Sequence, residues 1–259
     1  MSDTENQHCR LCGAPSHFTF RQRVLDHEVA YYDCRECGYF QTEAPYWLEQ
    51  AYASAINDVD TGIMMRNKLN VGRVIMTLLT VGKLKGRVVD HAGGYGILVR
   101  MLRDAGIDAK WRDKYCVNLL ARGFEAAEER FDLLTAFEVF EHLEHPLVEL
   151  RQMLEAAPTV LFSTELVPGP TTPSAQWWYL GPEHGQHIGF FRSLTLRKMA
   201  DELNCHHASD GVSVHVFSRE PIPRHWKRLL KMKQLAPWAT RLWLRSKTMD
   251  DFEFLRNDR

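Results

Sequence analysis

Four of the six cysteines fall within the first 37 residues, with a spacing that suits a metal ion. They form two CxxCG motifs about twenty residues apart. Four thiolates presented in this way surround a tetrahedral Zn²⁺, and the glycines relieve the strain of each turn. The pattern favours zinc over a disulfide pair or a redox motif, and a closed site of this kind stabilises a fold rather than doing chemistry. The predicted ligands are Cys9, Cys12, Cys34 and Cys37.

A second group of interest is the stretch VVDHAGGYG, which runs from an aspartate into three glycines. A strand that ends in Asp90 and is followed by glycines before a helix is typical of a nucleotide-binding loop, because the backbone can then approach a ligand closely. A tight strand-to-helix turn is the alternative. Asp113 ends the next expected strand, about twenty residues further on, where a carboxylate binds ribose hydroxyls. The glycines are Gly93, Gly94 and Gly96.

A third group lies in the proline-rich stretch VPGPTTPSAQWWYLGPEHGQHIGFF. Connections this long without regular structure are usually functional, and this one should hang over the carboxyl edge of the sheet. Histidine is the default base at neutral pH, so His184 and His187 are candidates, with Glu183 beside them. Hydrogen bonding to loop carbonyls is the alternative for the histidines. The aromatic run 177–179 either walls a pocket or packs under the loop.

The stretch EVFEHLEHP supports two interpretations. On a helical turn, Glu138, Glu141 and His142 share one face and could hold a divalent metal ion. Alternatively, Glu141 and His142 brace the loop and its neighbouring strand. Magnesium prefers oxygen ligands, which favours the second interpretation.

The elements that would position these residues alternate between strand and helix from Gly86 onward. Such alternation predicts an α/β fold with a doubly wound, Rossmann-like and mostly parallel sheet. The expected strands cover 87–92, 107–113, 131–137, 159–166 and 212–220. The expected helices cover 95–106, 146–157 and 194–203.

Periodic apolar residues predict two further helices, at 45–56 and 64–82, which connect the cysteine motifs to the sheet. Together with shifts in composition, they divide the chain into four parts. The parts are a zinc-binding unit (1–44), a helical cap or linker (45–84), a Rossmann-like domain (85–220) and a basic helical C-terminal extension (221–259).

The C-terminal extension has its own charge pattern. From Arg219 to Lys247, Glu220 is the single acid among nine basic residues interleaved with tryptophan and leucine. This predicts basic amphipathic helices broken near Pro237. Packing on the main domain, contact with an anionic membrane, binding of an acidic carrier or nucleotide diphosphate, and a subunit contact all stay open.

The whole-chain composition limits the function classes. The 259 residues are 45% hydrophobic and 25% charged with a net charge of −1, which indicates a globular protein and disfavours nonspecific nucleic-acid binding. The polar N-terminus and the absence of a long apolar run predict a cytoplasmic protein.

The chain resembles the class I methyltransferases that use S-adenosylmethionine. The resemblance rests on VVDHAGGYG, WRDKY and RFDLLTAFEVFEHLEHP and covers most of 85–220. It implies that Asp113 holds the ribose and that Phe137 and Glu138 lie beside the sulfonium. Ala92 replaces the first glycine of the usual DxGxGxG, and its methyl is either accommodated or weakens cofactor affinity. The remaining implied cofactor residues are Asp90, Gly93, Gly94 and Gly96.

PEHGQH further resembles a Glu-His pair of sugar C-methyltransferases, which are longer and also carry an N-terminal zinc domain. This implies His184 as the base and Glu183 as its orienting partner or as an anchor for the ligand. The expected function is therefore methyl transfer from S-adenosylmethionine to a small molecule, a sugar or a biosynthetic intermediate of secondary metabolism. The alternatives are a metal-assisted O-methyltransferase using Glu138, Glu141 and His142, or a nonenzymatic scaffold with a degenerate cofactor site. A zinc-ribbon RNA methyltransferase is disfavoured, because no NPPF-like motif follows the fourth strand.

Overall fold

The computed structural model describes residues 6–52, 61–127 and 129–257. The chain forms two compact units. The first unit comprises Met1–Asn57, Glu138–Gln152 and Phe162–Phe217. The second unit comprises Asp58–Phe137, Met153–Leu161 and Ser218–Arg259. The division into four parts stays a prediction.

The alternation of strand and helix predicted from Gly86 onward is confirmed, and with it the Rossmann-like fold. A sheet of six strands has the order β10-β11-β8-β7-β5-β6, and β5 pairs in parallel with both β6 and β7. The central strands β7 and β8 are buried almost throughout, as expected for parallel strands covered on both faces. The strands are β5 (Arg87–His91), β6 (Asp108–Arg112), β7 (Leu133–Phe137), β8 (Thr159–Ser163), β10 (His206–Ser209) and β11 (Val214–Ser218).

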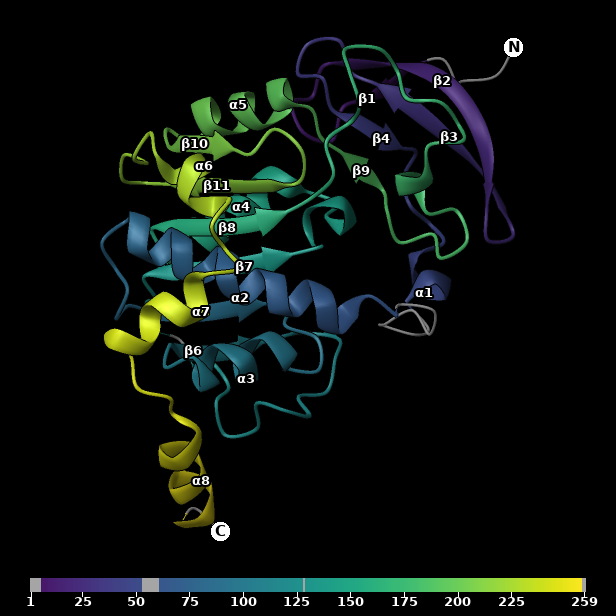
Figure 1. Ribbon diagram of the computed structural model, residues 1–259. Coiled ribbons are helices and arrows are strands. Elements are labelled where there is room, and N and C mark those ends of the chain that lie inside the picture. The colour runs from purple at the N-terminus through teal and green to yellow at the C-terminus, as the bar shows by residue number, and fades with distance from the viewer. Residues whose placement is uncertain (1–5, 53–60, 128, 258–259) are drawn as a thin grey trace. The chain divides into compact units, whose positions relative to one another are not determined.

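In the second unit, helix α2 contacts both α3 and α6 (Figure 1). Trp226 of α6 is buried, and its indole donates a hydrogen bond of 3.1 Å to the Thr77 hydroxyl on α2. The beginning of the C-terminal extension is therefore packed on this unit. The helices and the 3-10 turn here are α2 (Ile63–Thr80), α3 (Ile97–Asp104), α6 (Trp226–Leu230), α7 (Ala236–Ala239), η3 (Thr240–Leu242) and α8 (Thr248–Asn257).

The break expected near Pro237 lies just before it. The turn covers 231–235, and α7 begins at Ala236 with Pro237 as its second residue. Proline is tolerated in the first turn of a helix, where its missing N–H would have no partner anyway. Pro237 thus lies in the start of a helix and not in the break.

The last helix, α8, is docked on α3 by buried charges. Asp251 accepts hydrogen bonds from Arg103 at 2.8 and 2.6 Å and from Arg100 at 2.7 Å. Arg103 and Asp251 are only 6% and 4% exposed. Burial raises the pKa of Asp251, but the hydrogen bonds from the two arginines outweigh it and hold this pKa below its ordinary value. The C-terminal segment is therefore a docked helix.

The first unit contains a separate antiparallel sheet with the order β1-β2-β3-β4-β9 (Figure 1). Its strand β9 comes from the loop after PEHGQH and pairs with β4 through Phe40 and Phe190. Tyr31, Phe40, Trp47 and Phe190 are buried in the core of this unit. The strands are β1 (Asn6–His8), β2 (Pro15–Val24), β3 (His27–Asp33), β4 (Phe40–Thr42) and β9 (Gly189–Phe190).

The remaining helices are mostly short ones of the first unit, and α4 is divided between the two units. The helix expected at 45–56 contains only four described residues of α-helix, and its last residues, 53–56, lie outside the described ranges.

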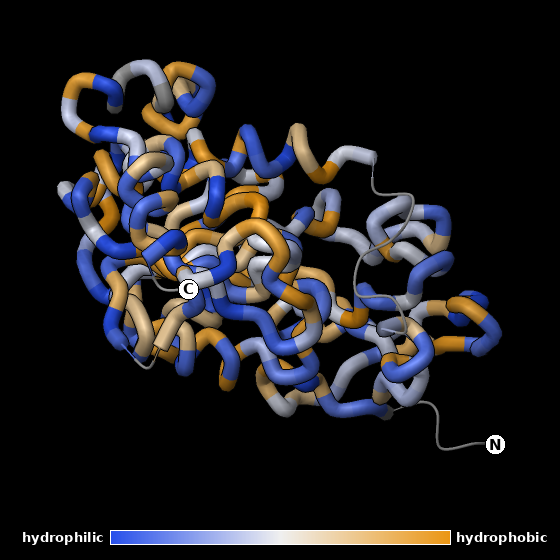
Figure 2. The backbone as a smooth tube through the Cα atoms, turned by 90° about the horizontal axis from the view of Figure 1, so that it is seen from below, coloured by the Kyte–Doolittle hydropathy of each residue, from blue (hydrophilic) through white to orange (hydrophobic). Residues whose placement is uncertain are grey.

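Along the tube of Figure 2, hydrophobic and hydrophilic stretches alternate. Across the described ranges, we find no helix with the length and apolarity to span a bilayer. The remaining elements are α1 (Leu48–Ala51), η1 (Phe140–His142), α4 (Pro146–Ala156), η2 (Trp178–Leu180) and α5 (Ser193–Glu202).

Candidate functional site

The glycine loop connects β5 to α3 through residues 92–96. Gly96 begins α3 with φ of +82°, and a Cβ there would lie 2.8 Å from Asn118 Oδ1 and 2.9 Å from the Cβ of Ala121. At Gly93, a Cβ would come within 2.8 Å of the Trp111 ring. Both positions therefore require glycine for conformation or space.

Ala92 adopts a left-handed conformation with φ of +56° and is exposed. Because the residue is exposed, the methyl group at this departure from the glycine pattern is accommodated. The conformation itself costs an alanine about 1 kcal/mol. Ala92 is therefore compatible with the turn but lowers the stability of the folded protein.

Asp90, the last buried residue of β5, is only 4% exposed. Its Oδ1 accepts a hydrogen bond of 2.6 Å from the Thr135 hydroxyl on β7. Burial raises the pKa of Asp90 to about 7, and the neighbouring charge of Asp113 acts in the same direction. This carboxyl therefore changes its charge near neutral pH.

Asp113 follows β6 and ties the glycine loop to that strand. Its Oδ2 accepts the Gly94 N–H at 2.9 Å, while Oδ1 accepts the N–H groups of Tyr115 and Cys116 at 2.7 and 2.8 Å. A carboxylate oxygen offers two lone pairs, so Oδ2 is the oxygen that keeps one for a further donor such as a hydroxyl. The geometry fits the predicted ribose contact.

Phe137 and Glu138 lie at the carboxyl end of β7. Phe137 is half-buried, whereas Glu138 is exposed and has φ of +56°. The Glu138 N–H donates to the Ser163 hydroxyl at 2.9 Å, and that hydroxyl donates to the Glu138 carboxylate. Glu138 is therefore held by Ser163 in a strained backbone conformation, which is common at functional sites.

The four N-terminal cysteines gather as predicted. The sulfurs of Cys9 and Cys37 are 3.6 Å apart, as are those of Cys12 and Cys34, and all four lie within 4.8 Å of one another. These separations are close to the ~3.8 Å edge of a tetrahedron with Zn–S bonds of about 2.3 Å. They are much longer than a disulfide bond of about 2.05 Å. The cluster is compatible with zinc.

The histidines of PEHGQH meet the residues that follow β7. The Ile188 N–H donates to the Glu141 carbonyl at 2.8 Å, which brings His187 beside η1. The rings of His142 and His187 are 5.0 Å apart, and those of His184 and His187 are 4.7 Å apart. Sequence reasoning treated these as two separate groups, and no spacing signal links residues so far apart in the chain.

The cysteine motif also supports this loop. Arg10, directly after Cys9, donates from its side chain to the carbonyls of Thr42, Glu43 and Ile188. Its backbone N–H donates to the Gln41 side chain at 2.8 Å. The first cysteine motif therefore holds the backbone next to His187.

Glu141, which is buried, and the half-buried His142 and His187 form a set of possible ligands. Burial raises the pKa of Glu141 to about 8, with the charge of Glu138 acting in the same direction. Burial likewise lowers the pKa of His142 and brings that of His187 to about 4. Without a bound cation, burial therefore favours the neutral form of all three side chains.

His184 has a defined ring orientation. The Gln186 N–H donates to its Nδ1 at 3.1 Å, so the neutral ring carries its proton on Nε2. Its ring lies against Gly181, where a Cβ would overlap it. Burial lowers the pKa of His184, and the exposed Glu183 raises it only in part.

The three aromatic residues at 177–179 differ in their exposure to solvent. Tyr179 is buried and Trp177 packs against the core of the first unit, whereas Trp178 is 71% exposed. The carbonyl of Tyr179 accepts a hydrogen bond of 2.6 Å from His187 Nδ1. Tyr179 and Trp177 therefore pack under the loop, which is the second of the two interpretations of this run.

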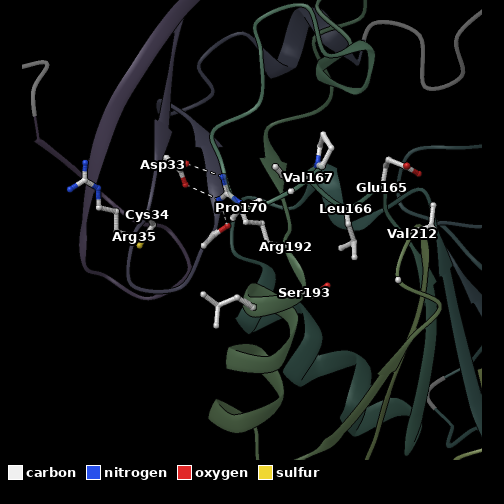
Figure 3. A pocket seen from close by; sticks show the side chains of 15 residues that line it. Asp33, Cys34, Arg35, Glu165, Leu166, Val167, Pro170, Arg192, Ser193 and Val212 are labelled. Atoms are coloured by element: carbon white, nitrogen blue, oxygen red, sulfur yellow. Dashed lines mark hydrogen bonds and ion pairs between the residues drawn. The ribbon is translucent and has the colours of Figure 1, made fainter.

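A cavity of about 710 Å³ in the first unit lies away from these histidines. In Figure 3, Arg192 points toward Asp33 at its wall, and the two form hydrogen bonds of 2.8 and 2.9 Å. The Arg192 guanidinium also donates to the Gly38 and Thr171 carbonyls. The charge of Arg192 is therefore already paired with that of Asp33. Of the predicted site residues, only Cys34 lines this cavity.

Beyond α6, the C-terminal extension exposes apolar side chains. Trp238 is 74% exposed and Leu242 is 83% exposed. Trp243 is also exposed, and Arg241 and Arg245 lie in the same segment. This surface combines aromatic and basic groups.

Known proteins offer several similarities. The described core resembles the structure of TnmH with a TM-score of 0.46 and 20% identity, over 68% of this chain and 62% of TnmH, so less than two thirds of that protein is matched. It resembles the magnesium protoporphyrin IX methyltransferase of Synechocystis PCC 6803 with a TM-score of 0.44 and 16% identity, over 66% and 90% of the two chains. It resembles the 1,6-didemethyltoxoflavin-N1-methyltransferase of Burkholderia thailandensis with a TM-score of 0.47 and 14% identity, over 77% and 97%.

Among curated proteins no sequence matches the chain. A family model described as a methyltransferase domain matches residues 65–208, which include the glycine loop, η1 and the PEHGQH loop. This match covers more than half of the chain and confirms the resemblance drawn from VVDHAGGYG. The protein therefore belongs to the methyltransferase domain family.

Proposed function

We propose that the protein transfers the methyl group of S-adenosylmethionine to a small-molecule acceptor, a sugar or an intermediate of secondary metabolism. The observation that carries this proposal is the glycine loop tied to β6 by the hydrogen bond from Gly94 to Asp113. Such a loop presents backbone to an adenosyl ligand and leaves one carboxylate lone pair for its ribose. Family membership favours this enzyme over a nonenzymatic scaffold.

The cofactor fits the residues present. Gly93, Gly94 and Gly96 keep side chains out of the loop, and Asp113 would bind the ribose diol through Oδ2. Asp90, buried at the end of β5, would face the cationic cofactor in its ionised form. S-adenosylmethionine supplies a methyl group already activated on a sulfonium, so the protein mainly has to align the acceptor.

Within this proposal, His184 acts as the general base. The acceptor atom gives its proton to His184 and forms the new bond to the methyl carbon, while the electron pair of the C–S bond remains on sulfur. The proton would enter at Nδ1 and replace the hydrogen bond from Gln186. A positioned base of this kind contributes about 10²–10⁴-fold to the rate.

Calorimetric titration with S-adenosylhomocysteine tests the cofactor site. We expect Asp113→Ala to weaken binding by about 10- to 100-fold, because a charge-assisted hydrogen bond is lost. Glu155→Gln, which removes an exposed acid from α4, is the charge-matched control and should leave binding unchanged. Absence of binding to the unmodified protein would refute the proposal.

The base is tested separately. His184→Ala should lower turnover by about 10²–10⁴-fold while the affinity for S-adenosylhomocysteine stays the same. His145→Gln removes an exposed histidine near η1 and should change neither quantity. Unchanged turnover in His184→Ala would assign His184 a structural role.

We also propose that Cys9, Cys12, Cys34 and Cys37 bind one structural Zn²⁺. The two sulfur pairs at 3.6 Å support this, and a closed four-thiolate site leaves no position for a substrate. The purified protein should contain one zinc ion per chain by elemental analysis. Replacement of Cys34 by Ser should release it and destabilise the first unit, and a zinc-free but fully stable protein would contradict the assignment.

For the C-terminal extension, we propose contact with an anionic membrane surface. The exposed Trp238, Leu242 and Trp243 beside Arg241 and Arg245 match the aromatic and basic composition of interfacial segments. Sedimentation with phosphatidylserine vesicles should exceed that with phosphatidylcholine vesicles and fall with added salt. Trp238→Ala with Leu242→Ala should reduce it, and equal sedimentation with both vesicle types would reject membrane contact.

A further inference from the structure

We propose that Glu141, His142 and His187 bind a divalent first-row transition metal ion. The three side chains come from two places in the chain, η1 and the PEHGQH loop, and converge inside the first unit. One ligand atom from each lies within 4.8 Å of the other two. This site is separate from the four cysteines, and it differs from the helical-turn set of the sequence analysis in that His187 takes the place of Glu138.

Glu141 is the strongest sign that a ligand belongs here. Its side chain is fully buried, and neither carboxylate oxygen has a partner with good hydrogen-bond geometry among the described residues, although the hydroxyls of Tyr179 and Thr164 interact with it more weakly. A buried carboxyl without a partner destabilises the folded state, so folded proteins almost always provide one. A cation between the carboxylate and the two imidazoles would supply the missing partner.

The surroundings of both histidines resemble those of metal ligands. A metal-bound histidine usually donates its other ring N–H to a carbonyl, carboxylate or similar acceptor. His187 Nδ1 donates to the Tyr179 carbonyl at 2.6 Å, which leaves Nε2 for the ion. The Tyr52 hydroxyl lies 3.1 Å from His142 Nδ1 and can accept its N–H, and the backbone of Gln186 also hydrogen-bonds with this ring, so metal binding would replace the Gln186 contact.

The chemistry of the set selects the ion class. Two imidazoles and one carboxylate are the ligands of catalytic zinc and of non-haem iron sites, and they disfavour Mg²⁺ and Ca²⁺, which prefer oxygen. Metal–ligand distances of 2.0–2.2 Å place neighbouring donors about 3.3 Å apart. Binding therefore draws the side chains inward from their present separations of up to 4.8 Å.

Three protein ligands leave coordination positions open. In the proposed methyl transfer, on which this step rests, an acceptor hydroxyl bound at an open position would become more acidic. His184, whose ring centroid is 4.7 Å from that of His187, would take its proton. The binding of the metal does not depend on this role.

The test uses the full-length protein with its cysteine site loaded with Zn²⁺, and Co²⁺ as the probe. Equilibrium dialysis should show one Co²⁺ per chain. Its absorption should consist of ligand-field bands of nitrogen and oxygen ligation, without the thiolate charge-transfer band that the cysteine site would give. Glu141→Gln and His187→Gln should each weaken Co²⁺ binding by at least about 10-fold. His145→Gln, an exposed histidine close to η1, should leave it unchanged.

Co²⁺ binding to the unmodified protein tests the proposal even if a variant fails to fold. No Co²⁺ bound beyond the cysteine site, or full binding retained in folded Glu141→Gln, overturns the proposal. Titration of the same samples with S-adenosylhomocysteine separates the two proposals. Cobalt binding without S-adenosylhomocysteine binding would refute the proposed function and leave the metal site standing.

Discussion

The Asp90 carboxyl should make stability depend on pH in a way that one isosteric substitution removes. Asp90→Asn keeps an oxygen that can accept the hydrogen bond from Thr135, but it cannot ionise. Burial raises the pKa of Asp90 in the folded protein from 3.8 to about 7. The substitution therefore isolates the cost of placing a negative charge at this buried position.

The sign and size follow from the two pKa values. Because the folded-state pKa is the higher one, the folded protein holds the proton more tightly, and its stability falls as pH rises from 3.8 to about 7. At about 1.4 kcal/mol per pH unit, the full loss is about 4 kcal/mol. Asp90→Asn should therefore match the unmodified protein below pH 3.8 and exceed its stability by up to about 4 kcal/mol above pH 7.

Urea unfolding of both proteins at several pH values between 4 and 8 measures this difference. Comparing the pair cancels the opposite contribution of the buried histidines, whose lowered pKa values remove stability as pH falls. A stability difference that stays constant across this range, or that favours the unmodified protein at pH 8, would refute the proposed burial of a titrating carboxyl.

Three substitutions test the rest of the second unit. Ala92→Gly should stabilise the protein by about 1 kcal/mol, because glycine adopts φ of +56° without strain, and a lower melting temperature would contradict this. Gly96→Ala should destabilise it by about 2–4 kcal/mol through its φ of +82° and the crowding by Asn118 and Ala121, measured by the same melting experiment. Asp251→Ala should cost about 3–5 kcal/mol, because it leaves Arg103 buried without its partner. Hydrogen exchange should then show α8 opened, and protection equal to that of the unmodified protein would mean that the charges do not hold it.

Local patterns were sufficient to predict the Rossmann-like core. The strands β5, β6 and β7 and helix α3 have the expected periodicity and lie within a few residues of the predicted ranges. The glycine loop follows from the same local signals, because the requirement of Gly96 for positive φ depends mainly on its immediate surroundings. The four cysteines were likewise predictable from spacing alone.

The rest depends on contacts between distant parts of the chain. The five-stranded sheet of the first unit was not predicted, since β9 joins β4 across about 150 residues. His187 joins Glu141 and His142 through the hydrogen bond from Ile188 to the Glu141 carbonyl, and no sequence period encodes that pairing. The ionisation of Asp90 and Glu141 is also set by burial, which depends on tertiary packing.

Arg10 joins the first cysteine motif to the loop that carries His187, so these two segments are not independent of each other. Its contacts with the Ile188 carbonyl and with β4 connect the thiolate cluster to the histidine loop. If the cysteines hold zinc as proposed, loss of the ion or oxidation of the thiolates should loosen this loop, whereas the hydrogen bonds of the glycine loop involve no cysteine side chain. On the proposed assignment of His184, a protein damaged in this way should keep its affinity for S-adenosylhomocysteine and lose turnover.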